Sequence, residues 1–156
     1  MFYLEDETII DASADKVFRF LTNINKLYKQ WHPKEHVFCA HIRGPLDKEK
    51  SLFHFFEFVG WLPLYLIVRV KRIESGHLIE DELFPLTSLG SGGFIIETIS
   101  PLQVKLIAYA HIGYNNFGGK ILDWLIGRLN IKGLALRHMK EEGENIKLFL
   151  RDNPNF

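Results

Sequence analysis

The sequence is short of three features that would assign a protein to a class: cysteines, an excess of one charge and long apolar runs. Its one cysteine, Cys39, excludes an intrachain disulfide and favours a reducing compartment, so we expect a cytoplasmic protein. Lys and Arg together number 19, as do Asp and Glu, which leaves no basic excess to attract nucleic acid. The longest apolar run, residues 61–68, contains Pro63 and is too short to span a bilayer. The acidic N-terminus lacks the basic start of a signal peptide.

The sequence does have the composition of an ordinary globular domain. Hydrophobic residues make up 47% of the 156 positions and charged residues 24%, so we expect one domain over residues 1–156. Aromatic residues are frequent, with 13 Phe, 5 Tyr and 3 Trp. They are compatible with a Phe-rich core and equally with an aromatic-lined cavity for an apolar ligand.

Local patterns divide the chain into a strand, two short helices, six strands and one long helix. Alternation predicts a first strand over 2–10, and Ser13 is the expected N-cap of the next element, a helix. A second helical segment, 24–30, ends near Pro33. The last helix is expected from beyond Gly119 to about Leu150, with an irregularity at Gly127 or Gly133. Turn signals separate the six strands, which we expect at 36–43, 51–60, 64–74, 77–84, 92–100 and 102–113.

This order predicts an α+β fold in which a curved antiparallel sheet of about seven strands wraps around the long C-terminal helix. Strands so close in sequence favour antiparallel neighbours, because parallel ones need long crossovers. The long helix is the one element able to cover the apolar face of the sheet. In element order the chain resembles the START/Bet v1-like superfamily (SRPBCC, polyketide cyclase-like), whose helix-grip fold implies a cavity for a small hydrophobic or aromatic molecule.

Two polar residues of the last helix interrupt its apolar stripe. At about 100° per residue, Glu142 falls about 40° from His138, on the same face as Ile131 and Ala135. Residues four apart lie one above the other on a helix, so an imidazole and a carboxylate can meet there on one ion. A buried carboxylate is costly unless it is paired or binds a metal. A simple His–Glu pair on the helix remains the alternative.

Two further segments contribute histidines and a carboxylate. The first is Trp31-His32-Pro33-Lys34-Glu35-His36, at the entry to the second strand. The second is Phe53-His54-Phe55-Phe56-Glu57-Phe58, in which Glu57 shares a strand face with Phe55 while His54 lies on the other face. If Phe55 faces the cavity, Glu57 does so too; the alternative is that Glu57 faces water.

These residues resemble the metal-site pattern of the diacetylphloroglucinol hydrolases, START-like zinc enzymes that cleave the bond between an acyl group and a phenolic ring. The resemblance implies a metal held by His36, Glu57, His138 and Glu142, with His32 as the alternative to His36. It also implies catalytic roles for Glu57, His138 and Glu142, beside a metal that polarises a carbonyl or phenolate oxygen and activates water. Zinc suits nitrogen and carboxylate ligands best, and Fe, Mn or Ni are alternatives. The chain departs from these enzymes in being much shorter, without their additional N-terminal region.

Three functions are compatible with these observations. The first is a zinc-dependent START-like hydrolase or lyase acting on a small hydrophobic or aromatic molecule; the others are a non-enzymatic carrier of such a molecule and a metal-free cyclase or dehydratase. Each leaves open whether the protein is a monomer or a homodimer. The residues expected to line the pocket are His32, His41, Phe55, Glu97, Trp124, Ile131 and Ala135.

Overall fold

The computed structural model describes residues 2–113 and 127–156 of the chain. Its helices and strands follow the predicted order from the N-terminal strand to the C-terminal helix. In chain order they are β1 (Phe2–Ile10), α1 (Ala14–Thr22), α2 (Ile24–Trp31), β2 (His36–Arg43), β3 (Leu52–Val59), β4 (Leu62–Glu74), β5 (Leu78–Leu83), β6 (Gly90–Ser100), β7 (Gln103–Ile112) and α4 (Ile131–Asp152).

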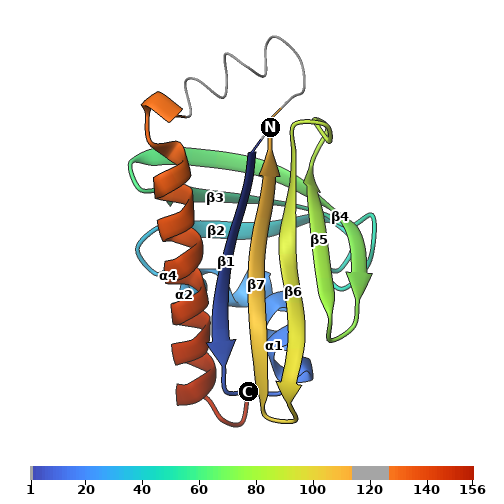
Figure 1. Ribbon diagram of the computed structural model, residues 1–156. Coiled ribbons are helices and arrows are strands. Elements are labelled where there is room, and N and C mark those ends of the chain that lie inside the picture. Colours follow the sequence, from blue (N-terminus) through green and yellow to red (C-terminus); the bar gives the residue numbers. More distant parts are fainter. Residues whose placement is uncertain (1, 114–126) are drawn as a thin grey trace.

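The seven strands form one antiparallel sheet in the order β1-β7-β6-β5-β4-β3-β2. Strands β2 to β6 each pair with the next strand along the chain, whereas β1 pairs with β7 and lies at one edge of the sheet. Figure 1 shows the sheet strongly curved, with α4 running alongside β1 and with β2 and β3 crossing it at a steep angle. The predicted α+β helix-grip architecture is confirmed.

One face of the sheet, here called the inner face, carries the helices and the core. In β1 the residues Phe2, Leu4, Thr8 and Ile10 are buried while those between them are mostly exposed, as expected for a strand covered on one side. The helix α4 comes very close to β1 at Gly143, where an added Cβ would lie 2.2 Å from Thr8 Oγ1. The most deeply buried core side chains are Ile10, Val17, Phe20, Val70, Ile96, Val104, Leu106 and Ile146.

The short helices carry apolar residues on the face turned to this core. Ser13 caps α1 as predicted, its side chain accepting a hydrogen bond from the backbone N–H of Lys16 at 3.3 Å. In α2 the buried residues are Ile24, Tyr28 and Trp31, which the helical repeat places on one face. This helix ends immediately before His32, where Pro33 prevents its continuation.

The predicted helical region before α4 is only partly described, because residues 120–126 lie outside the described residues. Residues 127–128 are helical, and α4 starts at Ile131, because Asn130 adopts a left-handed backbone conformation with φ of 53° and so interrupts the regular hydrogen-bond pattern. The irregularity therefore falls between Gly127 and Gly133 rather than on either of them. The predicted pocket residue Trp124 lies outside the described residues. Within 2–113 and 127–156, each helix is too short or too polar to cross a membrane.

Candidate metal centre

The inner face brings His36, Glu57, His138 and Glu142 together from three elements. His36 opens β2 directly opposite Glu57 of β3, and residues opposite each other in an antiparallel pair share a face. His138 and Glu142 lie one turn apart on α4, which packs against β3. The side chains are almost completely enclosed: His36, His138 and Glu57 are 3%, 6% and 9% exposed. The prediction that Glu57 shares the inner face therefore agrees with its burial.

The donor atoms of these residues are spaced as metal ligands would be. His36 Nε2 lies 3.3 Å from His138 Nε2, 3.4 Å from Glu57 Oε2 and 3.1 Å from Glu142 Oε1. His138 Nε2 lies 3.8 Å from the same Glu142 oxygen and 4.0 Å from the Glu57 oxygen. Tetrahedral bonds of about 2.0–2.1 Å separate neighbouring ligand atoms by roughly 3.3–3.4 Å. His36, Glu57 and His138 form a group able to hold a metal, and Glu142 Oε1 lies within 3.8 Å of both histidine nitrogens of this group.

Hydrogen bonds on the far side of each imidazole leave both Nε2 atoms free to coordinate. The Nδ1–H of His36 donates to the carbonyl oxygen of Tyr28 at 2.8 Å. The Nδ1–H of His138 donates to Glu35 Oε2 at 2.6 Å. Each Nε2 then carries a lone pair directed at the other ring and at two carboxylates. These lone pairs and carboxylate oxygens repel one another unless a proton or a cation lies among them. Metal-binding histidines commonly have such partners.

The two carboxylates have opposite electrostatic environments. Burial, reinforced by the charge of Glu142, raises the pKa of Glu57. Burial alone would also raise the pKa of Glu142, but the hydrogen bond with His36 and the charges of the nearby histidines together outweigh it and lower that pKa. For His36, burial would lower the pKa, but the same hydrogen bond and the charges of Glu142 and Glu57 together outweigh it and raise the pKa. Glu142 is therefore the carboxylate most readily ionised here, and a divalent cation would favour ionisation of both.

Tyr28 and Glu35 belong to this site although no sequence pattern assigned them to it. The Tyr28 ring stacks on His36 with centroids 3.9 Å apart and planes at 11°, and its hydroxyl donates to Glu57 Oε2. Glu35 is held by the backbone N–H of Gly60 at 3.1 Å in addition to His138. A buried tyrosine requires a partner for its hydroxyl, so the buried face of α2 was a usable signal for Tyr28. Glu35 carries no such local signal, because its partner is 103 residues away.

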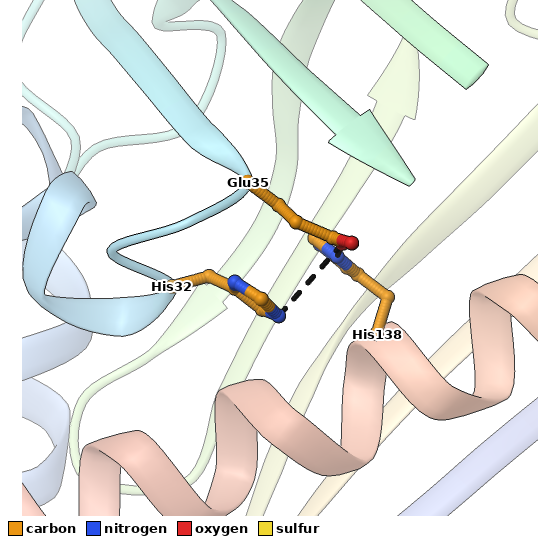
Figure 2. Close-up of side chains that lie close together, drawn as sticks. All are labelled: His32, Glu35 and His138. Atoms are coloured by element: carbon orange, nitrogen blue, oxygen red, sulfur yellow. Dashed lines mark hydrogen bonds and ion pairs between the residues drawn. The ribbon is translucent and has the colours of Figure 1, made fainter. Parts of the chain in front are cut away.

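A second histidine, His32, lies beside His138 but is not one of the four residues grouped above. Figure 2 shows His32, Glu35 and His138 close together, with the two rings stacked at 4.8 Å and 7°. His32 Nε2 hydrogen-bonds Glu141 Oε2 at 2.8 Å instead of pointing at Glu57, and burial lowers the pKa of His32. His32, Glu35 and His138 also form a group that could hold a metal. This histidine borders an outside groove of about 540 Å³ between α4 and the segment that follows α2.

The other predicted pocket residues are divided between the site and the surface. Phe55 lies on the inner face with its ring 5.8 Å from that of Tyr28, and Ile131 and Ala135 pack against an apolar cluster on β1. His41 and Glu97 are both exposed, which corrects their prediction as pocket residues.

The physical reasons for these two corrections differ. His41 lies at the end of β2, where the strand leaves the sheet and its Nδ1 bonds the carbonyl of Gly44 at 2.8 Å. Glu97 faces outward and pairs with Lys105 at 2.8 Å, because the inner face of β6 carries Phe94 and Ile96. Both faces of β6 contain apolar residues, so alternation alone could not identify the inner one.

No family model and no curated protein matches the sequence. Solved structures do match. They include a START superfamily protein from Mycobacterium smegmatis, with TM-score 0.72 and 15% identity over 96% of this chain and 97% of that one. The Zhui aromatase/cyclase from a Streptomyces species has TM-score 0.62 and 12% identity, covering 90% of this chain and 93% of its own.

A third match is BexL, a di-domain ARO/CYC from a biosynthetic pathway, with TM-score 0.68 and 18% identity. The match covers 100% of this chain and 48% of BexL, so the chain spans about half of that protein. At such low identities the likeness is evidence for the fold alone. The chain therefore has the START/Bet v1-like fold.

Proposed function

We propose that the protein is a zinc-dependent hydrolase that removes an acyl group from a small phenolic or other aromatic molecule. The observation that carries the proposal is the spacing of the donor atoms of His36, Glu57, His138 and Glu142, at 3.1–4.0 Å from one another where measured. Two imidazole nitrogens and two carboxylate oxygens suit Zn²⁺ better than Ca²⁺ or Mg²⁺, which prefer oxygen ligands alone. The resemblance to the diacetylphloroglucinol hydrolases supports the same four ligands.

The bound ion would supply Lewis acidity toward a carbonyl oxygen and would lower the pKa of water. The chain's own residues maintain the site around it. Tyr28 holds the Glu57 carboxylate and stacks on His36, while Glu35 fixes the ring of His138. In the proposed reaction water breaks the bond between acyl carbon and ring carbon; its hydroxyl joins the acyl group to give a carboxylic acid, and its hydrogen replaces that group on the ring.

Activity on acylated phenols tests the proposal. Resorcinol and phloroglucinol that carry an acetyl group on a ring carbon are incubated with zinc-loaded protein. The released acetic acid and free phenol are measured by chromatography. We expect equal amounts of both products, loss of activity with a chelator and recovery when zinc is added. His138→Ala should be inactive, whereas the matched variant His54→Ala changes a histidine on the opposite face of β3 and should retain activity. Release no faster than in buffer, or unaffected by chelation, contradicts the proposal.

A metal-free cyclase or dehydratase is a second candidate, and the same cluster favours it. Tyr28, Glu57 and His36 form a buried hydrogen-bonded group of the kind used for acid–base catalysis. Matched structures include an aromatase/cyclase of the same fold. Activity on a polyketide substrate that survives complete removal of metal would support this candidate over the hydrolase.

A further inference from the structure

Asp81 is a carboxylic acid on the inner face, and its Oδ1 atom has no partner among the described residues. Its Oδ1 atom has less than 1 Å² of exposed surface and no hydrogen-bond donor or acceptor within reach. The two acids beside it on β5 face outward and are paired, Glu80 with Lys71 at 2.6 Å and Glu82 with Arg69. Alternation thus directs the middle acid of the run inward. A buried polar group without a partner is costly, so its presence requires an explanation.

The residues beside this carboxyl on β6 and β7 are small. Asp81 lies opposite Val70 on β4 and opposite Gly92 on β6, and the next residue in the row is Ala110 on β7. Val70 is 1% exposed, which places the row on the core side of the sheet. Because Gly92 has no side chain and Ala110 has one methyl group, neither covers the carboxyl from the β6 side.

A second buried polar atom without a partner lies on α2, on the core side of the helix. Trp31 Nε1 is buried and has no acceptor among the described residues. The Trp31 ring meets Phe94 edge-on, with centroids 5.4 Å apart. Phe94 lies on the same face of β6 as Gly92, two residues away, and is therefore a diagonal neighbour of Asp81. The unpaired donor and the unpaired carboxyl thus flank one aromatic ring.

This pair belongs to the same interior as the candidate metal centre. The Trp31 ring lies 6.4 Å from that of His36. Burial, together with the charges of Asp81 and Glu57, raises the pKa of the Cys39 thiol to about 12, which places Cys39 within electrostatic reach of both carboxyls. A ligand bound at His36 and Glu57 could therefore extend toward Asp81.

We infer that Asp81 binds a hydroxyl group of an aromatic ligand, and that Trp31 donates a hydrogen bond to an oxygen of the same ligand. The inference deepens the proposed function and rests on it for the ligand's acyl group at the metal. Burial, with a smaller effect from Glu80, raises the pKa of Asp81 to about 7. The neutral acid can both donate to and accept from a hydroxyl, so the subsite suits an uncharged phenol.

Binding of three related compounds tests the inference. Affinities of para-hydroxybenzophenone, its meta isomer and unsubstituted benzophenone are measured by titration calorimetry on the full chain, with metal removed and with zinc present. We expect one hydroxylated isomer to bind about tenfold more tightly than benzophenone, the size of one buried hydrogen bond. In Asp81→Leu the hydroxylated compound and benzophenone should bind about equally well, whereas Asp81→Asn should retain part of the preference. Glu80→Gln, which changes the adjacent outward acid, is the matched control and should leave it unchanged.

Several results would overturn the inference: no compound binds, wild-type protein shows no preference, or the preference persists in Asp81→Leu. Circular dichroism establishes that each variant is folded, and Asp81→Asn provides a second test if the leucine variant is not. The metal-free measurement separates this inference from the proposed function. A hydroxyl preference in a protein that never binds zinc would support the subsite and contradict the hydrolase.

Discussion

Glu35 is the residue that determines how His138 presents itself to an ion. Its carboxylate accepts the Nδ1–H of His138 at 2.6 Å and is fixed in turn by the N–H of Gly60. Burial would raise the pKa of Glu35, but the hydrogen bond with His138, the charges of His138 and His32 and the N–H of Gly60 together outweigh it and lower the pKa. An ionised partner of this kind orients the ring and makes the opposite nitrogen a stronger ligand.

Replacing Glu35 should therefore weaken zinc binding without unfolding the protein. Glu35→Gln removes the charge but keeps the size, and we expect zinc affinity to fall by roughly 10–100-fold. Competition with a chromogenic chelator measures the change. Glu144→Gln removes an exposed carboxylate from α4 and serves as the control, with affinity within about twofold of the wild type. Equal affinities for Glu35→Gln and the wild type would show that the hydrogen bond has no such role.

Tyr28 supports the site through its hydroxyl, and this contribution can be isolated. Tyr28→Phe keeps the ring stacked on His36 but leaves the buried Glu57 without its donor. We expect the free energy of unfolding of the metal-free protein to fall by about 1–3 kcal/mol, measured by urea denaturation. The control Tyr65→Phe removes a hydroxyl that bonds His54 on a side chain 58% exposed, and should change stability by less than about 0.5 kcal/mol. Similar losses in both variants would contradict a supporting role for the Tyr28 hydroxyl.

Asp81 should make stability depend on pH in a defined direction. The unfolded chain releases this proton near the usual 3.8, whereas the folded protein retains it to about 7. Ionisation therefore destabilises the folded state progressively between those values, and the loss is complete above them. Glu80, Cys39 and Tyr109 are described titratable groups that interact with it, and its neighbours Val70 on β4 and Gly92 on β6 are uncharged.

The variant Asp81→Asn removes this ionisation. Its stability relative to the wild type should therefore be greater at pH 8 than at pH 5 by roughly 1–3 kcal/mol, measured by urea denaturation of metal-free protein. Glu80→Gln, on the outer face, provides the comparison and should show no such gain. A relative stability that is the same at both pH values would mean that Asp81 ionises normally.

Among the elements, the packing of α4 on β1 decides where His138 and Glu142 lie. Gly143 permits close approach, because a Cβ there would come within 2.2 Å of Thr8 Oγ1. We expect Gly143→Ala to destabilise the protein by about 1–3 kcal/mol in spite of alanine's higher helix propensity, as followed by thermal unfolding. The control is Gly127→Ala, where no atom lies within 4 Å of the added Cβ. Gly143→Ala as stable as the wild type would show that the contact yields readily.

The elements themselves were largely predictable from the sequence, and the exceptions have local causes. The strands are close to their expected bounds because turn residues separate them. In β2 a register shift between His36 and Phe38 inserts one residue, so alternation counted from His36 assigns the wrong face to the later residues of this strand. The irregularity expected at Gly127 or Gly133 falls at Asn130 instead, where a left-handed backbone conformation interrupts the helix without a glycine or a proline.

For the whole molecule, the sequence predicted a fold and the pairs within each element, but not every contact between elements. His138 and Glu142 lie one turn apart on a helix, so their spacing alone predicted that they would meet. Their approach to His36 was expected through a resemblance, and the distances are compatible with it. Tyr28 and Glu35 join the site only through tertiary packing, which no local pattern records.

The curvature of the sheet connects the two parts of the interior. Strands β2 and β3 carry His36 and Glu57 to α4, while β5 carries Asp81 on the same inner face. Between them lie Phe55 and Cys39, opposite each other in the β2–β3 pair. A ligand that spans this interior would meet the candidate metal centre at one end and an unpaired acid at the other.

The metal content of the purified protein decides whether the proposed centre exists. Protein purified without chelator is analysed for zinc, iron, manganese and nickel by mass spectrometry, alongside the variants His138→Ala and His54→Ala. We predict close to one equivalent of zinc per chain in the wild type and His54→Ala, and almost none in His138→Ala. Less than about a tenth of an equivalent in the wild type, also after incubation with zinc and dialysis, would contradict a metal centre formed by His36, Glu57, His138 and Glu142.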